Sequence, residues 1–490
     1  MNYITPEKVG ISSENIIDFI EKLEDAKLST HSLILAKGDN IFFESYWKPF
    51  DKEFLHRQYS VSKSIVSIAI GFCEQDGLLS LDDRISKHFP KECEKQTDEN
   101  LLNQTIRDML TMSTAKTDRY WFADKPKDRV AYYFENDKSD TRPPGTIFDY
   151  DSSASFVLGA LTERLTKKPF MEYLREKLFD KIGVSKEAYC LKAPGGHSWG
   201  DSGVLCTSLD LLKIARFVMN KGRWNGEQIL NEKYITDATS NLIDTNITGE
   251  NDYDMQGYGY QIWRFKYNGF FFNGMGCQFA VCIPDKNLIM IYNGDNQGKT
   301  APKRIIFDAF CENIVNKMGN ASPCVGDCNR LKEYTAKLKL SSAIGKIHTD
   351  FEKEINGVTY IVNKENPMGI TKFKLDFEGD NGIFSYTNAQ GDKEIAFGMC
   401  KNEFTFFPQE GYADEIGTEK TIKFYYKCAA SAAWIEEKKL FIKVQIIDKY
   451  FGNLNITFGF KGNKVGVWMQ KAAEDFLNEY EGILEGEMQL

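Results

Sequence analysis

A serine lies three residues before a lysine at the start of the apolar segment "YSVSKSIVSIAIGF", residues 59–72. On a helix, Ser60 and Lys63 would be neighbours, because side chains three positions apart share a face. The free N–H groups and positive dipole end of the first turn would stabilise an oxyanion formed when Ser60 attacks a carbonyl. The same field disfavours a charged Lys63, and a neutral amine could take the serine proton. We predict a nucleophile and its base, with a simple N-cap serine as the alternative.

Two other Ser-x-x-Lys matches occur in the chain, and their contexts do not favour catalysis. Ser45 and Lys48 lie in "NIFFESYWKPF", which is typical of a strand, where residues three apart point to opposite faces. Ser113 and Lys116 follow the apolar face of "TIRDMLTM", at a predicted helix end. Only Ser60 opens a strong helical pattern. Its apolar positions at helical spacing are Ile65, Ile68, Ala69 and Phe72.

A candidate proton relay follows in "PPGTIFDYDSSASFVLG", residues 143–159. Tyr150 stands between a Pro-Gly turn and an apolar helix, with Ser152 two residues later. A tyrosine near a cation such as Lys63 could shuttle protons during acyl transfer. The alternative is a partly buried loop tyrosine without a catalytic role.

A candidate oxyanion donor lies in "FFNGMGCQF", residues 271–279. Two glycines interrupt an otherwise strand-like run, which often marks close backbone approach to a ligand or a bulge. The N–H of Met275, next to Gly274 and Asn273, could therefore bind an oxyanion.

These three segments, in this order, resemble the serine β-lactamase and penicillin-binding-protein superfamily, in particular its class C-like branch of esterases, D-amino-acid peptidases and amide hydrolases. "YSVSKS" resembles the nucleophile motif, "DYDSS" the Tyr-x-Asn motif, and "FNG" at 272–274 the Lys-Thr-Gly motif. The likeness covers roughly residues 5–315. It implies catalytic Ser60, Lys63 and Tyr150, with oxyanion or substrate-binding positions at the residues Met275, Gly274, Asn273 and Ser152.

Two positions depart from that family pattern. Phe272 stands where family lactamases and carboxypeptidases have a carboxylate-binding cation, and Ser152 stands where they have an amide. The resemblance therefore implies a serine hydrolase of esters or amides, an esterase or peptidase rather than a β-lactamase. A non-catalytic binding protein with the same fold is the alternative, although intact Ser60, Lys63 and Tyr150 weigh against it.

A rival nucleophile motif, Gly196-x-Ser198-x-Gly200, has the pattern of an α/β-hydrolase elbow. Such an elbow needs a strand directly before it and a helix directly after it. Here "APG" precedes the motif and the extended segment "DSGVLCTS" follows it. This context disfavours the interpretation of Ser198 as an α/β-hydrolase nucleophile. His197 and Trp199 stay candidates for the rim of the substrate pocket, with Tyr120 and Trp121 from the loop at 115–145.

Composition excludes several functional classes. The chain has a net charge of −9 and no stripe of basic residues, so its charge does not favour nucleic-acid binding. No apolar run approaches the roughly 18 residues that cross a bilayer, and "MNYITPEKVGISSENI" lacks the features of a secretory signal. We therefore expect a cytoplasmic protein that does not bind membranes. The five histidines show no ligand spacing, so we expect no metal and no cofactor. The expected partner is a small ester, amide or short peptide, and the oligomeric state is left open.

The 490 residues divide into two predicted domains. Strand patterns from both ends of residues 1–320 surround a helical stretch, which predicts an α/β (α+β) β-lactamase/transpeptidase-like domain with an antiparallel sheet flanked by helices. Residues 321–348 are predicted as a linker. Alternating strands over 349–490 predict an antiparallel β domain, a barrel or lipocalin-like sandwich, closed by a short helix at Ala472–Tyr480.

Overall fold

The computed structural model describes residues 1–122, 124, 126–135, 141–246, 251–319, 325–409, 425–474 and 476–489. These residues form two compact units, Met1–Lys339 and the part from Leu340 onward. None of the helices in these ranges is long and apolar enough to cross a bilayer.

The first unit is built on a seven-stranded sheet in the order β1-β3-β2-β12-β11-β10-β9. Its neighbours are antiparallel, except that the short β1 pairs with β3 in parallel. The strands therefore come from both ends of the unit, as predicted. Their bounds are β1 Asn2–Tyr3, β2 Thr30–Lys37, β3 Asn40–Tyr46, β9 Trp263–Phe265, β10 Gly269–Gly274, β11 Gln278–Ile283 and β12 Leu288–Gly294.

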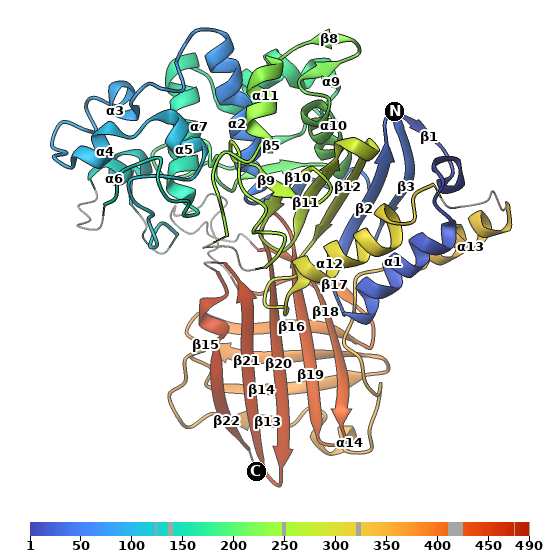
Figure 1. Ribbon diagram of the computed structural model, residues 1–490. Coiled ribbons are helices and arrows are strands. Elements are labelled where there is room, and N and C mark those ends of the chain that lie inside the picture. Colours follow the sequence, from blue (N-terminus) through green and yellow to red (C-terminus); the bar gives the residue numbers. More distant parts are fainter. Residues whose placement is uncertain are drawn as a thin grey trace. The chain divides into compact units, whose positions relative to one another are not determined.

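Helices cover both faces of this sheet (Figure 1). On one face, α1 (Ser13–Asp25) and α12 (Pro302–Phe310) share a core with inward side chains of the strands. Ser12 caps α1 by accepting a hydrogen bond from the N–H of Asn15. On the other face, α10 (Ser208–Met219) packs on β11 and β12, and α2 (Val61–Gln75) packs on β10.

The central insertion is mostly helical, as the sequence predicts. Its longest helix, α7 (Ser152–Thr166), packs against α2. The remaining helices are α3 Ile85–His88, α4 Glu99–Asn103, α5 Ile106–Leu110, α6 Arg129–Glu135, α8 Phe170–Leu174, α9 Asp180–Ile182 and α11 Glu232–Ala238. The small strands are β4 His56–Arg57, β5 Tyr189–Cys190, β6 Val204–Cys206, β7 Arg223–Trp224 and β8 Glu227–Gln228.

The segment predicted as a linker contains a helix, α13 (Val325–Thr335), which belongs to the first unit. Tyr334 donates a hydrogen bond of 2.7 Å to Glu24 of α1, and Arg330 pairs with Glu14 of the same helix. These contacts extend the compact unit to Lys339. The mixed Gly, Ser and charged composition did not indicate this helix. The contacts that stabilise it are with residues more than 300 positions away in the sequence.

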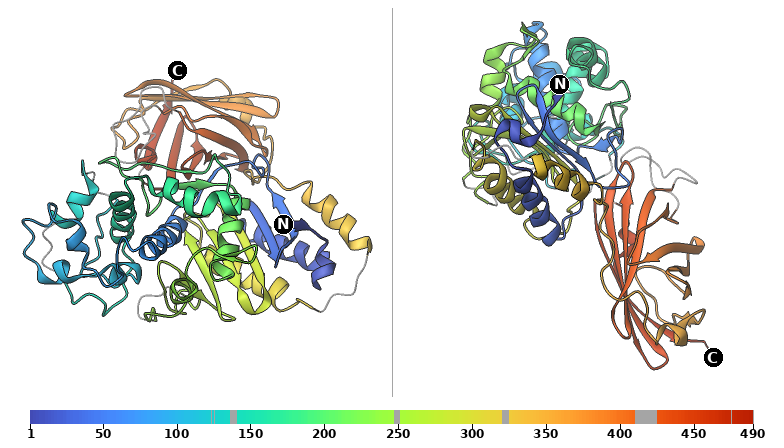
Figure 2. Two further views of the ribbon diagram at one scale, coloured as in Figure 1. Left: turned by 90° about the horizontal axis from the view of Figure 1, so that it is seen from above. Right: turned by 90° about the vertical axis from the view of Figure 1, so that its right-hand side faces the viewer.

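The second unit is the predicted β domain, and its described strands form a barrel (Figure 2). Nine of them close in the order β16-β15-β14-β13-β22-β21-β20-β19-β18, because β16 also pairs with β18. Aromatic side chains fill its inside, among them Phe373, Phe384 and Phe458. The bounds are β13 Thr359–Ile361, β14 Lys372–Glu378, β15 Asn381–Asn388, β16 Gly391–Met399, β17 Glu403–Phe406, β18 Lys427–Glu436, β19 Lys439–Ile447, β20 Phe451–Lys461, β21 Lys464–Ala473 and β22 Gly482–Met488, with α14 at Glu352–Ile355.

The predicted closing helix at Ala472–Tyr480 is wrong. Strand β21 continues to Ala473, which pairs with Gly452 of β20, and only a 3₁₀ turn forms at Asn478–Tyr480. Leu477 adopts a positive φ of 60°, which stops a helix from running through this point. The hydroxyl groups of Tyr480 and Tyr386 form a hydrogen bond of 2.7 Å. This side-chain contact attaches the turn to strand β15 of the barrel.

Candidate active site

Ser60 stands immediately before α2, at the position where the sequence places a nucleophile. The preceding Tyr59 adopts a positive φ of 46° and is fully buried, with the Arg57 guanidinium 4.3 Å from its ring centre. The N–H of Gln58 donates to the Val204 carbonyl at 2.8 Å. A strained residue held by packing and hydrogen bonds fixes the direction of the chain as it enters the helix.

Lys63 lies one turn into α2, and its side chain is buried. Its Nζ donates to Ser60 Oγ at 2.9 Å and to the main-chain oxygen of Asp201 at 2.7 Å. Nζ also lies 5.2 Å from the centre of the Tyr150 ring. Because α2 is buried on all sides from Val61 to Cys73, the lysine turns toward these polar atoms rather than toward solvent.

Tyr150 is positioned by the residue that follows it. Asp151 caps α7 by accepting from the N–H groups of Ser153 and Ala154, and it also accepts from Thr114 Oγ1 at 3.0 Å. Burial raises the pKa of the Asp151 carboxyl to about 6, an effect that these hydrogen bonds oppose. The Tyr150 ring stacks on Trp263 of β9 at 5.9 Å. The cap and the stacking together hold Tyr150 beside Lys63.

Gly274 brings the end of β10 close to the backbone before Ser60. A Cβ atom at this glycine would lie 2.4 Å from the carbonyl oxygen of Gln58, so only glycine fits. The next residue is Met275, whose carbonyl accepts from Gln278 Nε2 at 2.8 Å. Within the described chain, the N–H groups of Ser60 and Met275 have no hydrogen-bond acceptor. Both donors are therefore available to a bound oxygen.

A buried polar network connects these two backbone segments, and no sequence motif predicts it. Asn293 Nδ2 donates to Gln58 Oε1 and to Gln278 Oε1, each at 3.2 Å. Gln58, Gln278 and Asn293 are all fully buried. A satisfied network of this kind fixes the relative position of the Ser60 turn and the Met275 turn.

Ser60, Tyr150 and Met275 line one cavity of about 760 Å³. Its other walls include the aromatic side chains of Phe148, Trp263 and Phe279, the predicted Asn273 and Gly274, and charged side chains. The charged lining residues are Asp149, Asp254, Lys299, Lys303 and Arg304. Among the described residues, neither Ser152, the first residue of α7, nor Trp121 or Trp199 lines this cavity. Trp121 and Trp199 are buried, whereas Tyr120 is exposed.

The rival Ser198 does not have the environment of a hydrolase elbow. It lies between the short strands β5 and β6, forms an isolated bridge with Lys192, and is followed by β6 rather than by a helix. Neighbouring His197 bonds Glu163 through Nδ1 at 2.8 Å. The α/β-hydrolase interpretation is therefore excluded by local structure.

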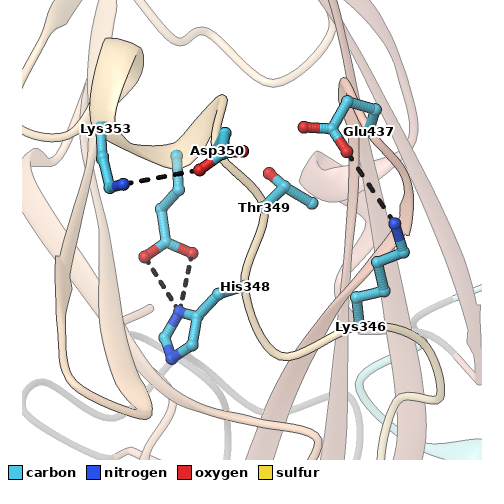
Figure 3. A pocket seen from close by; sticks show the side chains of 7 residues that line it. Lys346, His348, Thr349, Asp350, Lys353 and Glu437 are labelled. Atoms are coloured by element: carbon cyan, nitrogen blue, oxygen red, sulfur yellow. Dashed lines mark hydrogen bonds and ion pairs between the residues drawn. The ribbon is translucent and has the colours of Figure 1, made fainter.

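A second cavity, of about 430 Å³, lies in the barrel unit (Figure 3). Its charged side chains pair with one another: His348 with Glu352 at 3.1 Å, Lys353 with Asp350 at 3.5 Å. It holds no arrangement of nucleophile and base. Nor does any group of three or more His, Cys, Asp or Glu side chains in the described ranges have the geometry of a metal site.

The comparison with protein families decides the family. The beta-lactamase family model matches residues 17–309, more than half of the 490 residues. The chain belongs to the beta-lactamase family. The match contains Ser60, Lys63, Tyr150 and the turn at Met275.

Known relatives of this beta-lactamase-family chain include two named hydrolases. It is 23% identical to the 6-aminohexanoate-dimer hydrolase of Paenarthrobacter ureafaciens over 235 residues, 44% of this chain and 58% of that protein. It is 29% identical to the lovastatin esterase of Penicillium rubens over 153 residues, 26% of this chain and 38% of that protein. The matched part thus spans less than two thirds of either relative.

A solved structure shows the same fold over nearly the whole chain. The octameric penicillin-binding protein homologue from Pyrococcus abyssi aligns with 96% of this chain and 99% of its own, at a TM-score of 0.51 and 16% identity.

Phe272 stands where the resemblance to the family led us to expect a carboxylate-binding cation. Its side chain is fully buried and contacts Phe270 at 6.3 Å between ring centres. It does not line the cavity among the described residues. The Phe272 side chain thus serves packing and offers a substrate no charge.

Proposed function

We propose that this protein is a serine hydrolase that cleaves an ester or amide through an acyl-enzyme. The hydrogen bond of 2.9 Å from Lys63 Nζ to Ser60 Oγ, together with the cavity that Ser60, Tyr150 and Met275 line, carries the proposal. The named relatives support it, since one is a 6-aminohexanoate-dimer hydrolase and the other is a lovastatin esterase.

In the proposed reaction, Lys63 in its neutral form takes the proton of Ser60 as Oγ attacks the substrate carbonyl. The N–H groups of Ser60 and Met275 donate to the oxyanion of the tetrahedral intermediate. The proton passes by way of Tyr150 to the leaving alcohol or amine as its bond to the carbonyl carbon breaks. Water then attacks the acyl group by the reverse proton path and frees Ser60.

The substrate lies, in this proposal, between Asn273 and Gly274 on one side and the aromatic wall of Trp263 on the other. Because Phe272 offers no cation at the family's carboxylate site, esters and amides are favoured over β-lactams.

Hydrolysis of p-nitrophenyl esters and acyl anilides of increasing acyl length tests this function. We expect a burst of nitrophenol close to one per protein, and turnover that is lost in Ser60→Ala but kept in Ser198→Ala. A Ser60→Ala variant as active as the wild type would contradict the proposal.

A further inference from the structure

Gln261 has a backbone conformation that residues other than glycine seldom adopt. Its φ is +59°, in the left-handed region, and the residue is buried two positions before Trp263 of β9. Such a conformation persists only where the surrounding structure holds it, and it concentrates at functional sites. Gln261 is not among the described residues that line the cavity at Ser60, so any effect on catalysis passes through the residues that it contacts.

The hydrogen bonds that hold Gln261 go to three helices. Its carbonyl accepts from Ser64 Oγ of α2 at 2.7 Å, and its Oε1 accepts from Ser155 Oγ of α7 at 2.6 Å. Its Nε2 donates to the carbonyls of Met109 and Leu110, at the end of α5, at 2.9 and 3.1 Å. Its main-chain N–H also donates to Leu110, at 2.9 Å. A buried network in which every polar atom has a partner favours one rigid arrangement.

Both contacts of the Gln261 amide lead to Tyr150. Ser155 lies in the first turns of α7, the helix that Tyr150 precedes. The chain that leaves α5 reaches Met112, whose carbonyl accepts from the N–H of Asp149 at 2.9 Å, directly before Tyr150. The amide therefore holds the backbone on both sides of Tyr150.

The main chain of Gln261 holds the nucleophile instead. Ser64 follows Lys63 in α2, so the Gln261 carbonyl bonds the helix that Ser60 precedes. The amide and the carbonyl thus attach different parts of the site. A substitution of the side chain removes the contacts that lead to Tyr150 and keeps the contact with α2.

We propose that Gln261 is a positioning residue, whose amide sets the distance between the Tyr150 hydroxyl and the Ser60–Lys63 pair. This rests on the proposed function, in which Tyr150 passes a proton to the leaving group. Gln261 exchanges no proton and does not touch the substrate. The step that depends on the distance is protonation of the leaving oxygen or nitrogen as its bond to the acyl carbon breaks. That proton comes from Ser60 by way of Lys63.

Two butyrate esters with different leaving groups test the proposal. The p-nitrophenolate ion is stable and leaves without a proton, whereas the oxygen of benzyl alcohol must be protonated as it leaves. Gln261→Met has a similar length and keeps the main-chain bond to Ser64 but lacks the amide. We expect kcat/KM to fall by about 10²-fold for benzyl butyrate and by less than about threefold for p-nitrophenyl butyrate.

Three serine variants separate the contacts of Gln261. Ser155→Ala removes only the bond to α7, and kcat/KM for benzyl butyrate should fall about 10-fold relative to that for p-nitrophenyl butyrate. Ser64→Ala should lower both values in equal proportion, because it acts on the nucleophile helix. Ser67→Ala is the matched control. It removes a buried hydroxyl of α2 that bonds Tyr234 rather than Gln261, and its ratio should equal that of the wild type.

The rate at which a fluorophosphonate labels Ser60 is a second readout, because fluoride leaves without a proton. Gln261→Met should be labelled about as fast as the wild type, with its folding checked by circular dichroism. If Gln261→Met does not fold, Ser155→Ala decides. Equal losses for the two esters in a folded variant overturn the role of Gln261, because a general structural defect lowers both. Turnover of both esters that persists in Ser60→Ala overturns instead the proposed function.

Discussion

Lys63 Nζ and Ser60 Oγ are 2.9 Å apart, within the first turn of a helix that is buried from Val61 to Cys73. The contact follows from helical spacing, since the two residues lie one turn apart. Its direction follows from burial, because in the described part of the chain the acceptors of the lysine amine are Ser60 Oγ and the carbonyl of Asp201.

Replacing the proposed base should stop acylation while leaving the fold intact. Lys63→Met fills a similar volume without burying a charge, so we expect a folded protein whose labelling rate falls by about 10³-fold or more. Lys48→Met, in another Ser-x-x-Lys match, is the control and should react normally, because Lys48 is exposed. Full reactivity of Lys63→Met at neutral pH would show that another group takes the serine proton.

Tyr150→Phe should keep the ring stacked on Trp263 and lose only the hydroxyl. We expect ester turnover to fall by about 10²-fold or more, the usual cost of removing a group that transfers protons. Tyr258→Phe removes a hydroxyl from the same aromatic cluster, where Tyr258 lies 5.0 Å from Trp263 between ring centres. Equal losses in both variants would point to packing rather than to proton transfer.

Gly274→Ala should disturb the oxyanion donors. The new Cβ would lie 2.4 Å from the Gln58 carbonyl oxygen, so β10 and the Ser60 turn must separate. Misplacing one donor typically costs about 10²-fold in rate. Gly459→Ala, at a barrel position with nothing within 4 Å, should react as the wild type does. A fully active Gly274→Ala enzyme would remove Met275 from the mechanism.

Much of the site could be predicted because its signals are local. The helix after Ser60, the turn before Tyr150 and the glycines around Met275 each appear within a few residues of sequence. Asp201, Gln278 and Asn293 could not be found this way, since their contacts join residues at least 15 positions apart. The strands at both ends of the first unit could be predicted because each has a local pattern. The packing of α13 on α1 could not, because it joins segments far apart in the sequence.

His56 should make the protein sensitive to acid. It is buried, and burial lowers its pKa from 6.5 to about 3. Between pH 6.5 and about 3, His56 therefore binds a proton in the unfolded chain but not in the folded protein. Its contribution to the free energy of unfolding is fully present above pH 6.5 and is lost as the pH falls. The loss approaches about 1.4 kcal/mol per pH unit.

The His56 contribution can be isolated by comparing urea unfolding of the wild type and His56→Gln from pH 4 to pH 7. The contribution of Asp151 to the free energy of unfolding depends on pH in the opposite direction. Because its pKa is raised in the folded protein, this contribution is lost as the pH rises from about 4 to 6. Since both proteins contain Asp151, its effect cancels in the difference. A difference in the free energy of unfolding that does not change with pH would refute the assignment.

The most direct measurement is the mass of the intact protein and of its peptides after incubation with a fluorophosphonate. We expect one adduct, located on Ser60, which is absent from Ser60→Ala and present in Ser198→Ala. An adduct on Ser198, or a folded wild-type protein that never reacts with probes small enough for the cavity, would contradict it.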